Sequence, residues 1–373
     1  MVRLKLGMVG GGQGAFIGGV HRMAARLDGC FDLVAGAFSS DAVRAHASAA
    51  ELGIDVDRSY ADFNEMAKAE AARSDGIDAV SIVTPNHLHG SIAEAFLAHD
   101  ISVICDKPMT ATLAQAESLS AAAQASKGHF FLTHNYTGYP MIRQARQMVA
   151  EGALGEIRIV EANYLQDWLS EAPADDNKQA KWRMDAAQSG GGAIGDIGTH
   201  AHNLACFVTR LRATAVSATL SSNVAGRMVD DDARITLQFD SGARGHIWAS
   251  QVAIGNENNL TLAVYGTKGS LRWTQENPNF ITFTELGRAP QIITRGGGMA
   301  NAASAAVTRI PAGHTEGYLE AFATLYKEAA MAIRSPDKVN DAAINIEDGY
   351  DGVKFVNACQ NSSRNGASWV DLR

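Results

Sequence analysis

The chain has 373 residues, of which 46% are hydrophobic and 19% are charged, and its formal net charge is −8. A chain of this length suits two domains of ordinary size. Its negative charge, without any basic cluster, argues against nucleic acid and against anionic membrane surfaces as partners. No run of residues is long and apolar enough to span a bilayer. We therefore expect neither a nucleic-acid-binding nor a membrane protein.

The N-terminus and the cysteines bear on the compartment. The opening residues MVRLKLGMVGGG pass from two basic residues into a short apolar run that ends in glycines. A secretory signal has a longer apolar stretch and a small-residue cleavage site, so we interpret this run as a first strand. The four cysteines stand far apart, in no metal or disulfide spacing, at Cys30, Cys105, Cys206 and Cys359. This usage favours a reducing, cytoplasmic location.

The first part of the chain alternates short β-like runs with helix-like runs. The β-like runs are LKLGMV (4–9), FDLVAGAF (31–38), IDAVSIVT (77–84), ISVICD (101–106) and HFFLTHN (129–135). Alanine-rich segments such as 41–52 and 111–126 lie between them and are good helix formers. The alternation predicts a parallel sheet covered by helices.

From about residue 155 the chain changes to long β-rich runs with few helices between them. Such runs predict a mostly antiparallel sheet. Helix-like segments at 314–334 and 345–362 close the chain. We therefore predict an α/β protein with a first domain at 1–135 and a second, α+β domain with a large open sheet at 136–373. An alternative is that the closing helices pack back on the first domain.

The first chemical motif is GMVGGGQGAF, in which Gly10, Gly12 and Ala15 fit G-x-G-x-x-A between a strand and a helix. The first glycine allows the tight turn, the second lets a pyrophosphate approach the backbone, and the small third residue lets helix pack on strand. The pyrophosphate would sit on the helix N-terminus. With four further β/α units behind it, the motif predicts a Rossmann domain that binds a dinucleotide. The alternative is a plain glycine-rich turn.

The second strand bears on the choice between NAD and NADP. A strong preference for NAD needs an Asp or Glu at the end of this strand, where it binds the ribose. Here the strand ends in Ser39 and Ser40, and Asp41 falls beyond it as an expected helix cap. Arg44, one turn into the next helix, could reach a 2′-phosphate, or it could lie on a solvated helix face. We expect NAD to be used with incomplete exclusion of NADP.

Two more segments follow strands of the predicted parallel sheet. VTPNHLHG (83–90) and CDKPMT (105–110) each contain a proline that ends the strand, which points Asn86, His87 and Lys107 into the crevice above the sheet. His87 and His89 form an H-x-H pair, but without a third ligand of clear spacing a metal site is disfavoured. An isolated lysine after apolar residues needs a function or a partner. Asp106 is the alternative partner for Lys107.

In the second half, GGGAIGDIGTHAHNLA (190–205) combines three glycines with a helical pattern. Asp196, His200 and Asn203 stand at i, i+4 and i+7, so they share one narrow polar stripe. A separate apolar stripe is formed by Ile197, Ala201, Leu204 and Val208. The polar stripe is therefore predicted to face a site and the apolar stripe a core.

Together, GGGQGAF, VTPNHLH, DKP and GGGAIGDIGTHAHN make the chain similar to the Gfo/Idh/MocA family of oxidoreductases, over essentially its whole length. The resemblance implies a Rossmann domain, a C-terminal domain with a large open sheet, and hydride transfer between NAD(P) and a polyol or sugar hydroxyl. By motif it carries the catalytic roles to Lys107, Asp196 and His200. Members often have aspartate where this chain has Asn203.

These roles are chemically reasonable, because an alcohol that gives up hydride must also give up its hydroxyl proton to a nearby base. His200 is suited to accept the proton, since an imidazole has an ordinary pKa of about 6.5. Lys107 would stabilise the oxygen as it becomes negative. Asp196 would orient the substrate or keep the lysine charged, and the preceding glycines would let the loop approach the ring. The alternative is a core histidine and a capping aspartate.

The remaining expected site residues come from strand ends and from loops that the resemblance places near the cleft. The expected cofactor-binding residues are Gly10, Gly12, Gln13, Gly14, Ala15, Phe16, Ser39, Ser40, Arg44, Thr84, Pro85, Asn86, His89, Asp106 and Lys107. The expected substrate-binding residues are Lys107, Tyr136, Tyr139, Gln166, Trp182, Arg183, Asp196, His200 and His314. No metal is expected.

The sequence thus predicts an NAD(P)-dependent dehydrogenase that acts on a neutral cyclic polyol, a sugar or an anhydrosugar. One alternative is a metal-dependent sugar hydrolase or isomerase that uses the histidines of HLH and HAH with Asp196. Another is a sensor that binds a dinucleotide without catalysis. The second half has too little helix to cover both faces of its sheet, so a homodimer or homotetramer is expected.

Overall fold

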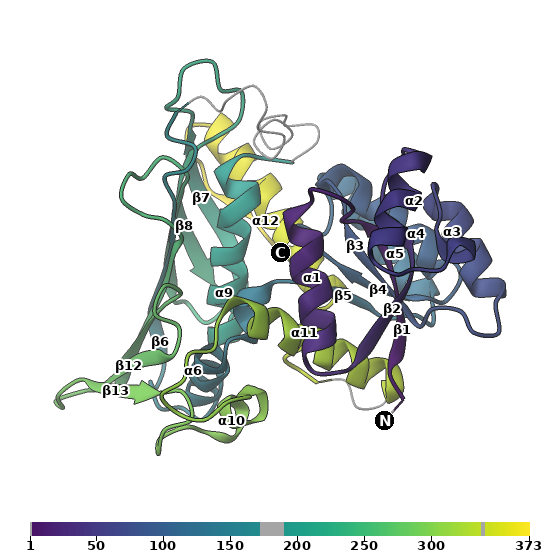
Figure 1. Ribbon diagram of the computed structural model, residues 1–373. Coiled ribbons are helices and arrows are strands. Elements are labelled where there is room, and N and C mark those ends of the chain that lie inside the picture. Colours follow the sequence, from purple (N-terminus) through teal and green to yellow (C-terminus); the bar gives the residue numbers. More distant parts are fainter. Residues whose placement is uncertain (1, 172–189, 337–339) are drawn as a thin grey trace. The chain divides into compact units, whose positions relative to one another are not determined.

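The structure is a computed structural model that describes residues 2–171, 190–336 and 340–373. The chain divides into two compact units (Figure 1). The first unit contains Met1–Asn135 and Phe322–Tyr350, and the second contains Tyr136–Ala321 and Asp351–Arg373. Each unit is thus built from two separate stretches of the chain, the second of which comes from the C-terminal part.

A five-stranded parallel sheet forms the centre of the first unit. Its order is β2-β1-β3-β4-β5, with strands β1 (Leu4–Gly10), β2 (Phe31–Ala37), β3 (Ala79–Val83), β4 (Ser102–Cys105) and β5 (Phe130–Leu132). All residues of β3, β4 and β5 are buried. Burial on both faces explains why these strands are mostly apolar, with Ser81 and Ser102 as their polar residues.

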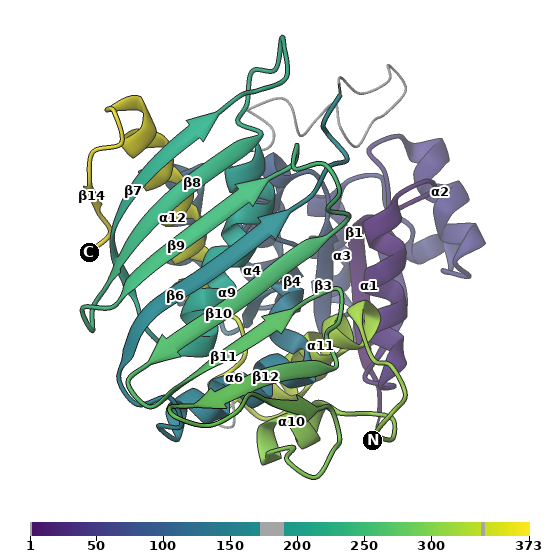
Figure 2. The ribbon, with the colours of Figure 1, turned by 90° about the vertical axis from the view of Figure 1, so that its left-hand side faces the viewer.

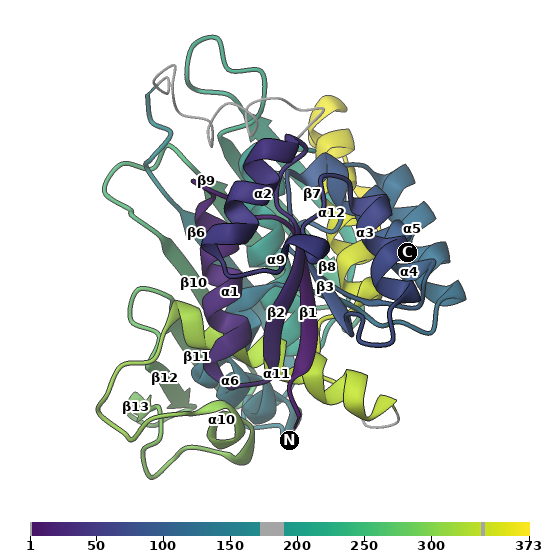
Figure 3. The ribbon, with the colours of Figure 1, turned by 45° about the vertical axis from the view of Figure 1, so that its right-hand side comes forward.

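Helices cover this sheet, as Figure 3 shows. They are α1 (Phe16–Leu27), α2 (Ala42–Glu51), α3 (Phe63–Ala72), α4 (His89–Leu97), α5 (Leu113–Ala125) and most of α11 (Tyr318–Arg334). Asp41, Asp62 and Thr112 cap α2, α3 and α5 by accepting hydrogen bonds from amides of the first turn. The predicted strand 129–135 is shorter than expected, because it ends at Leu132 and a 3₁₀ turn occupies Asn135–Gly138.

Helix α1 approaches the end of β1 very closely. A Cβ atom added at Gly18 would lie 2.4 Å from the Cα of Gly11, whereas one added at Gly19 would meet nothing nearer than 3.9 Å. The sequence motif suggested Ala15 as the small residue that permits this packing. The backbone contact itself occurs at Gly18.

The second unit contains a nine-stranded sheet of order β13-β12-β11-β10-β6-β9-β8-β7-β14. The strands are β6 (Ile157–Leu165), β7 (Ala213–Ser221), β8 (Asp232–Phe239), β9 (Arg244–Ser250), β10 (Asn259–Gly266), β11 (Gly269–Thr274), β12 (Phe280–Glu285), β13 (Gln291–Thr294) and β14 (Val370–Asp371). Every pairing is antiparallel except that of β6 with β9. The predicted α/β class and the mostly antiparallel second sheet are confirmed.

The large sheet has one covered and one open face (Figure 2). In β6, Val160, Ala162 and Tyr164 are buried, while Ile159 and Glu161 alternate with them and are exposed. Helix α9 (Thr199–Thr209) packs on β6, β9 and β10, and α6 (Pro140–Ala150) packs on β11 and β12. The period-two burial follows from a sheet that buries one face only.

The covered face also carries α12 (Ile346–Arg364), of which residues 351–364 belong to this unit. A short helix, α10 (Ala302–Val307), packs on α6. A π-helical turn, Ile194–Gly198, runs directly into α9. Among the described residues, no helix is long and apolar enough to cross a membrane.

The Gly18 contact makes a direct prediction for stability. We expect Gly18→Ala to lower the free energy of unfolding by about 1–3 kcal/mol, because the added methyl group overlaps backbone that cannot move aside. The matched variant Gly19→Ala should be neutral or stabilising, since its Cβ has room and alanine favours a helix by about 0.5–1 kcal/mol. Thermal unfolding of both variants checks this, and equal melting temperatures for the two would contradict it.

Candidate functional site

In the first unit, the loop between β1 and α1 has a backbone conformation that favours glycine. Gly10, Gly11 and Gly14 have φ angles of 81°, 70° and 77°. A Cβ atom at Gly10 would lie 2.9 Å from the carbonyl oxygen of Val83, and one at Gly12 would lie 2.9 Å from the carbonyl oxygen of Phe38. The loop therefore offers bare backbone, without side chains, next to the N-terminus of α1.

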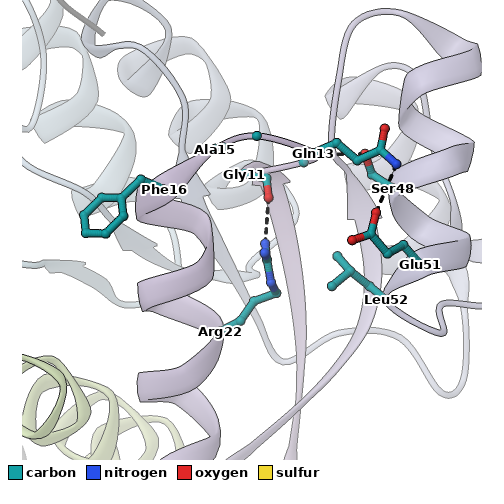
Figure 4. Close-up of a pocket in the computed structure, with 10 residues that line it drawn as sticks. Gly11, Gln13, Ala15, Phe16, Arg22, Ser48, Glu51 and Leu52 are labelled. Atoms are coloured by element: carbon teal, nitrogen blue, oxygen red, sulfur yellow. Dashed lines mark hydrogen bonds between the residues drawn. The ribbon is translucent and has the colours of Figure 1, made fainter.

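Beside this loop lies a pocket of about 280 Å³ (Figure 4). Its lining residues are Gly11, Gly12, Gln13, Gly14, Ala15, Phe16, Arg22, Ser48, Glu51 and Leu52. The Gln13 amide N–H donates to Ser48 Oγ at 3.2 Å, and the Gln13 side chain donates to Glu51 at 3.0 Å. Arg22 Nη1 donates to the Gly11 carbonyl at 2.6 Å. Helices α1 and α2 thus hold the glycine loop from two sides.

The carboxyl ends of β3 and β4 carry further expected cofactor residues. Thr84 Oγ1, after β3, is a buried polar atom with no hydrogen-bond partner within the described residues, and so is Nδ2 of Asn135, which follows β5 and was not expected from the sequence. In most folded proteins buried polar groups of this kind have a hydrogen-bond partner, so these two atoms suit a bound polar ligand. Together with the bare glycine backbone, they fit a dinucleotide at this edge of the sheet.

His89 braces two segments of this edge. Its ring nitrogens lie 2.8 Å from the Pro108 carbonyl oxygen and 2.8 Å from the Thr84 carbonyl oxygen. Burial lowers the pKa of the His89 imidazole, against the raising effects of these two carbonyls and of Asp106. A neutral imidazole donates to one of these two oxygens, so His89 makes one hydrogen bond and lies in contact with the segments that follow both β3 and β4.

Asp106 precedes Lys107 and sits in a dense set of hydrogen bonds. Its Oδ1 accepts from the Lys107 backbone N–H at 2.8 Å and from Thr133 Oγ1 at 3.1 Å. Burial would raise the pKa of the Asp106 carboxyl, but the interaction with His21, followed by the charges of Lys107 and His89, holds that pKa well below its usual range. The carboxylate therefore stays ionised and orders the segment that presents Lys107.

His21 is a buried residue that sequence reasoning missed. Its Nε2 lies 3.9 Å from Asp106 Oδ1, and its Nδ1 lies 2.8 Å from the hydroxyl of Tyr326 on α11. Ser81 completes the group, with its hydroxyl 2.8 Å from that of Tyr326. The one sequence signal of this network is a histidine within the first predicted helix. Its partners could not be predicted from the sequence, because they lie up to 305 residues away along the chain.

In the second unit, Asp196 lies in the π-turn and His200 lies in the first turn of α9. The helix predicted from their spacing is therefore interrupted at its start. Asp196 Oδ2 accepts from Gln251 Nε2 at 2.9 Å, and His200 is only 6% exposed. Asn203, the third member of the predicted stripe, is 7% exposed. Gln251 is a second residue that the sequence did not reveal, because it reaches Asp196 from the end of β9.

Asp230 holds the start of the π-turn. Its two carboxylate oxygens accept from the Gly192 N–H at 2.9 Å and the Ile194 N–H at 2.7 Å, and its backbone carbonyl accepts from the Ala193 N–H at 2.8 Å. A Cβ atom at Gly192 would lie 1.8 Å from that carbonyl oxygen. Burial raises the pKa of the Asp230 carboxyl, against the lowering effect of these amides. Gly192 is thus required by its close contact with the Asp230 backbone.

Two tyrosine rings contact His200, and amide side chains extend the hydrogen-bonded cluster from their hydroxyls. The ring of Tyr136 meets the His200 ring edge-on, with centroids 4.8 Å apart. The hydroxyls of Tyr136 and Tyr164 are hydrogen bonded to each other, and Tyr164 donates to Asn258 Oδ1 at 2.7 Å. Gln166 Nε2 donates to the same oxygen at 2.8 Å. Burial raises the pKa of the Tyr136 phenol, so it stays protonated. The cluster offers neutral hydrogen-bonding groups beside an imidazole.

Asn258 connects this cluster and was not expected from the sequence. It precedes β10, and the pairing of β10 with β6 brings it beside Gln166. Its Nδ2 donates to Gln275 at 3.1 Å, and Gln275 donates to the Tyr139 hydroxyl at 3.3 Å. Tyr139 also stacks on Tyr136. The sequence around Asn258 is a polar turn and carries no signal of a site. Only the register of β10 with β6 shows that Asn258 belongs to this cluster.

Several of the other expected site residues are exposed. Phe16 is 69% exposed, Arg44 is exposed, and Ser39 Oγ accepts from the Asp41 N–H. His314 lies on an exposed turn, where its carbonyl accepts from Arg295. Trp182 and Arg183 lie outside the described residues.

Comparisons with known proteins agree with both units. Residues 4–134 match a family model described as an oxidoreductase family with an NAD-binding Rossmann fold, and residues 142–272 match one described as a GFO/IDH/MocA C-terminal domain. The crystal structure of an oxidoreductase from Sinorhizobium meliloti is 49% identical, covers 99% of this chain and 100% of its own, and superposes with a TM-score of 0.90.

Two further relatives have more specific descriptions. An inositol dehydrogenase homologue from Azotobacter vinelandii, complexed with NADH and myo-inositol, is 36% identical over 99% of this chain and 97% of its own, with a TM-score of 0.92. Levoglucosan dehydrogenase from Pseudarthrobacter phenanthrenivorans is 30% identical over 74% of this chain and 75% of its own.

The fold, the glycine loop and these matches define an NAD(P)-dependent oxidoreductase with an NAD-binding Rossmann domain. The chain belongs to the Gfo/Idh/MocA family, and the proteins similar to it include sugar and polyol dehydrogenases. The resemblance seen in the sequence motifs is thereby confirmed.

The Asp230 contacts predict a local effect on the helix start. In Asp230→Asn an NH₂ group replaces one acceptor oxygen, so one of the Gly192 and Ile194 amides loses its partner. Because a hydrogen bond to a charged group is worth about 1.5–3 kcal/mol, amide exchange in residues 190–198 should accelerate roughly tenfold or more. Hydrogen exchange with mass spectrometry measures this. Asp240→Asn, at an exposed position, is the control and should leave this peptide unchanged.

Proposed function

We propose that this oxidoreductase moves hydride between NAD(P) and a secondary hydroxyl of a neutral cyclic polyol, sugar or anhydrosugar. The observation that carries the proposal is the cluster around His200, in which tyrosine hydroxyls and the amides of Gln166 and Asn258 form one hydrogen-bonded set. Such groups can donate to and accept from hydroxyls. A phosphate or carboxylate substrate would favour arginine instead.

The relatives support the same substrate class. One is described with myo-inositol bound, and another is named for levoglucosan, an anhydrosugar. Both compounds are neutral rings with several hydroxyl groups. Identities of 36% and 30% support the class of substrate and leave the particular compound to experiment.

The proposed catalytic set is Lys107, Asp196 and His200. Bound NAD(P) supplies the acceptor for the hydride. His200 takes the hydroxyl proton, and its edge-on contact with Tyr136 sets the orientation of its ring. Lys107 places a positive charge near the oxygen, on a segment ordered by Asp106. Asp196, held by Gln251, orients a substrate hydroxyl.

A metal-dependent hydrolase is the weaker alternative. His89 directs both ring nitrogens at backbone oxygens. Within residues 2–171, 190–336 and 340–373 there is also no group of three His, Cys, Asp or Glu side chains arranged to hold a metal ion. Elemental analysis of the purified protein separates the two classes, because stoichiometric zinc or manganese would favour the hydrolase.

The catalytic proposal predicts a separation of turnover from cofactor binding. His200→Ala should lower kcat by roughly 10²- to 10⁴-fold, because the proton loses its acceptor, and the Kd for NAD should stay nearly unchanged. Lys107→Ala should lower kcat at least as much. Cofactor reduction is first screened with inositols, aldoses and anhydrosugars, and the best substrate is then used for the variants.

Two controls make this experiment decisive. His99→Ala changes an exposed histidine just after α4, outside the proposed site, and shows whether the loss of any histidine lowers kcat or only the loss of His200. A phosphate ester of the best sugar tests the neutral-substrate proposal, and a clear preference for the ester would overturn it. Full turnover by His200→Ala at neutral pH would exclude His200 as the base. Full activity of Lys107→Ala would exclude Lys107, and no reduction with any polyol would favour the sensor.

We also propose that NAD is used with incomplete exclusion of NADP. The carboxylate of Asp41 accepts from the Arg44 N–H at 2.8 Å, so it is engaged in capping α2. The Arg44 side chain lies on the exposed face of that helix, from which a flexible arginine can reach a phosphate. Arg44→Ala should therefore lower kcat/KM with NADP and leave that with NAD unchanged. A wild-type preference for NAD over NADP beyond roughly 10⁴-fold would contradict this. A preference of that size needs repulsion of the 2′-phosphate by a carboxylate, and the loss of one hydrogen bond is too small to produce it.

We further propose a homodimer or homotetramer formed through the open face of the large sheet. In Figure 2 no described helix lies over this face. Ile159 is 42% exposed there, and Arg234 stacks on the ring of Trp248 on the neighbouring strand, with its guanidinium carbon 3.9 Å from the ring centre. A partly apolar, aromatic-bearing surface favours burial against a second copy.

Light scattering tests the assembly. Wild type at micromolar concentration should exceed the monomer mass of 39.5 kDa. Ile159→Arg should weaken association by placing a charge on the open face, whereas Ile254→Arg, on a loop where the side chain is 83% exposed, should not. A wild-type protein that is only monomeric would refute the proposal. The four cysteines, all within the described residues, form no disulfide, which supports the cytoplasmic location that we propose for the protein.

A further inference from the structure

Arg22 is a charged residue of α1 that the catalytic proposal leaves unused. It lies two turns into the helix and reaches back toward the glycine loop, as Figure 4 shows. Its Nη1 donates to the Gly11 carbonyl oxygen at 2.6 Å and contacts the sulfur of Met8 at 3.6 Å. The side chain is half-buried, so this hydrogen bond is partly shielded from water.

The hydrogen bond constrains a peptide that is otherwise free to rotate. Gly10 and Gly11 have positive φ angles and no side chains, so their peptide planes have several accessible orientations. A trans peptide places its carbonyl oxygen and its N–H on opposite sides. When Arg22 holds the Gly11 carbonyl, the Gly12 N–H must point to the other side of the loop, away from the guanidinium.

Two nearby amides of the loop, those of Gln13 and Ala15, already have acceptors. The Gln13 N–H donates to Ser48 Oγ at 3.2 Å, and the Ala15 N–H donates to the Gly12 carbonyl at 3.1 Å. The Gly12 N–H donates to no atom of the described residues. It is thus a loop amide that remains available for an anion, next to the N-terminus of α1.

The charge of Arg22 acts in the same direction. Burial lowers the pKa of the Arg22 guanidinium, against the raising effect of Glu51, and arginine nevertheless stays protonated in proteins. Glu51 accepts from the Gln13 side chain at 3.0 Å and thereby holds the far side of the same loop. The loop is therefore bound by a cation, Arg22, at the Gly11 carbonyl and by a carboxylate, Glu51, at the Gln13 side chain.

We propose that Arg22 is a cofactor-positioning residue, which aims the Gly12 N–H at the pyrophosphate of the dinucleotide by holding the Gly11 carbonyl. The glycines make room for the phosphates, and Arg22 selects the one peptide orientation that binds them. The residue acts through the loop backbone, so its effect falls on binding of the pyrophosphate and leaves the chemical step unchanged.

Direct binding measurements test this proposal without any polyol. Arg22→Met keeps the length of the side chain and removes the donor and the charge, and it should weaken NAD binding by about 10- to 100-fold. ADP-ribose contains the pyrophosphate and lacks the nicotinamide, so its Kd should rise by the same factor. Calorimetry gives both constants, and thermal unfolding of the unliganded variant reports whether the fold is kept. At saturating NAD, kcat should stay within about threefold of wild type.

Two matched variants complete the test. Arg26→Met removes an exposed arginine one turn further along α1 and should bind NAD like wild type. Arg22→Lys keeps the charge and a donor and should bind between wild type and Arg22→Met; if the methionine variant does not fold, Arg22→Gln takes its place. Wild-type affinity of Arg22→Met, an equal loss in Arg26→Met, no recovery in Arg22→Lys, or a loss for NAD without one for ADP-ribose would each overturn the proposal.

Discussion

The helix that carries His200 begins where two backbone segments are too close for any side chain. The Asp230 carbonyl lies where a Cβ atom of Gly192 would be, and the same residue accepts three consecutive amides, those of Gly192, Ala193 and Ile194. One aspartate thus takes the place of the missing turn of helix and satisfies amides that would otherwise be buried without partners. The π-turn with Asp196 starts from this contact, so the geometry of the candidate site depends on it.

The first unit uses the same kind of constraint at its cofactor edge. Helix α1 can approach the loop after β1 because Gly18 and Gly11 meet as bare backbone. Once the helix is this close, His21 and Arg22 on its next turn reach opposite targets. His21 faces Asp106 beside Lys107, and Arg22 holds the Gly11 carbonyl. A single close packing contact therefore orders both the dinucleotide loop and the strand end that presents the lysine.

Much of the fold could be predicted from local patterns. Mostly apolar runs bounded by glycine and proline predicted all five strands of the parallel sheet, because strands buried on both faces are rich in apolar residues. Only their ends differed, as at Leu132, where the last strand stops early. The glycine fingerprint and the Asp196–His200 spacing also marked both parts of the candidate site. These signals are local, since each depends on residues within one turn or one strand.

The sequence by itself determined which residue types stand next to each other along a strand or helix, and hence the fold class, the glycine loop and the polar helix. The tertiary structure alone decided which distant residues support them. Asn258 meets Gln166 through the register of β10 with β6, and Tyr326 meets His21 across 305 residues. The physical reason is that a hydrogen bond depends on distance in space, and strand pairing and helix packing set that distance without any mark in the nearby sequence.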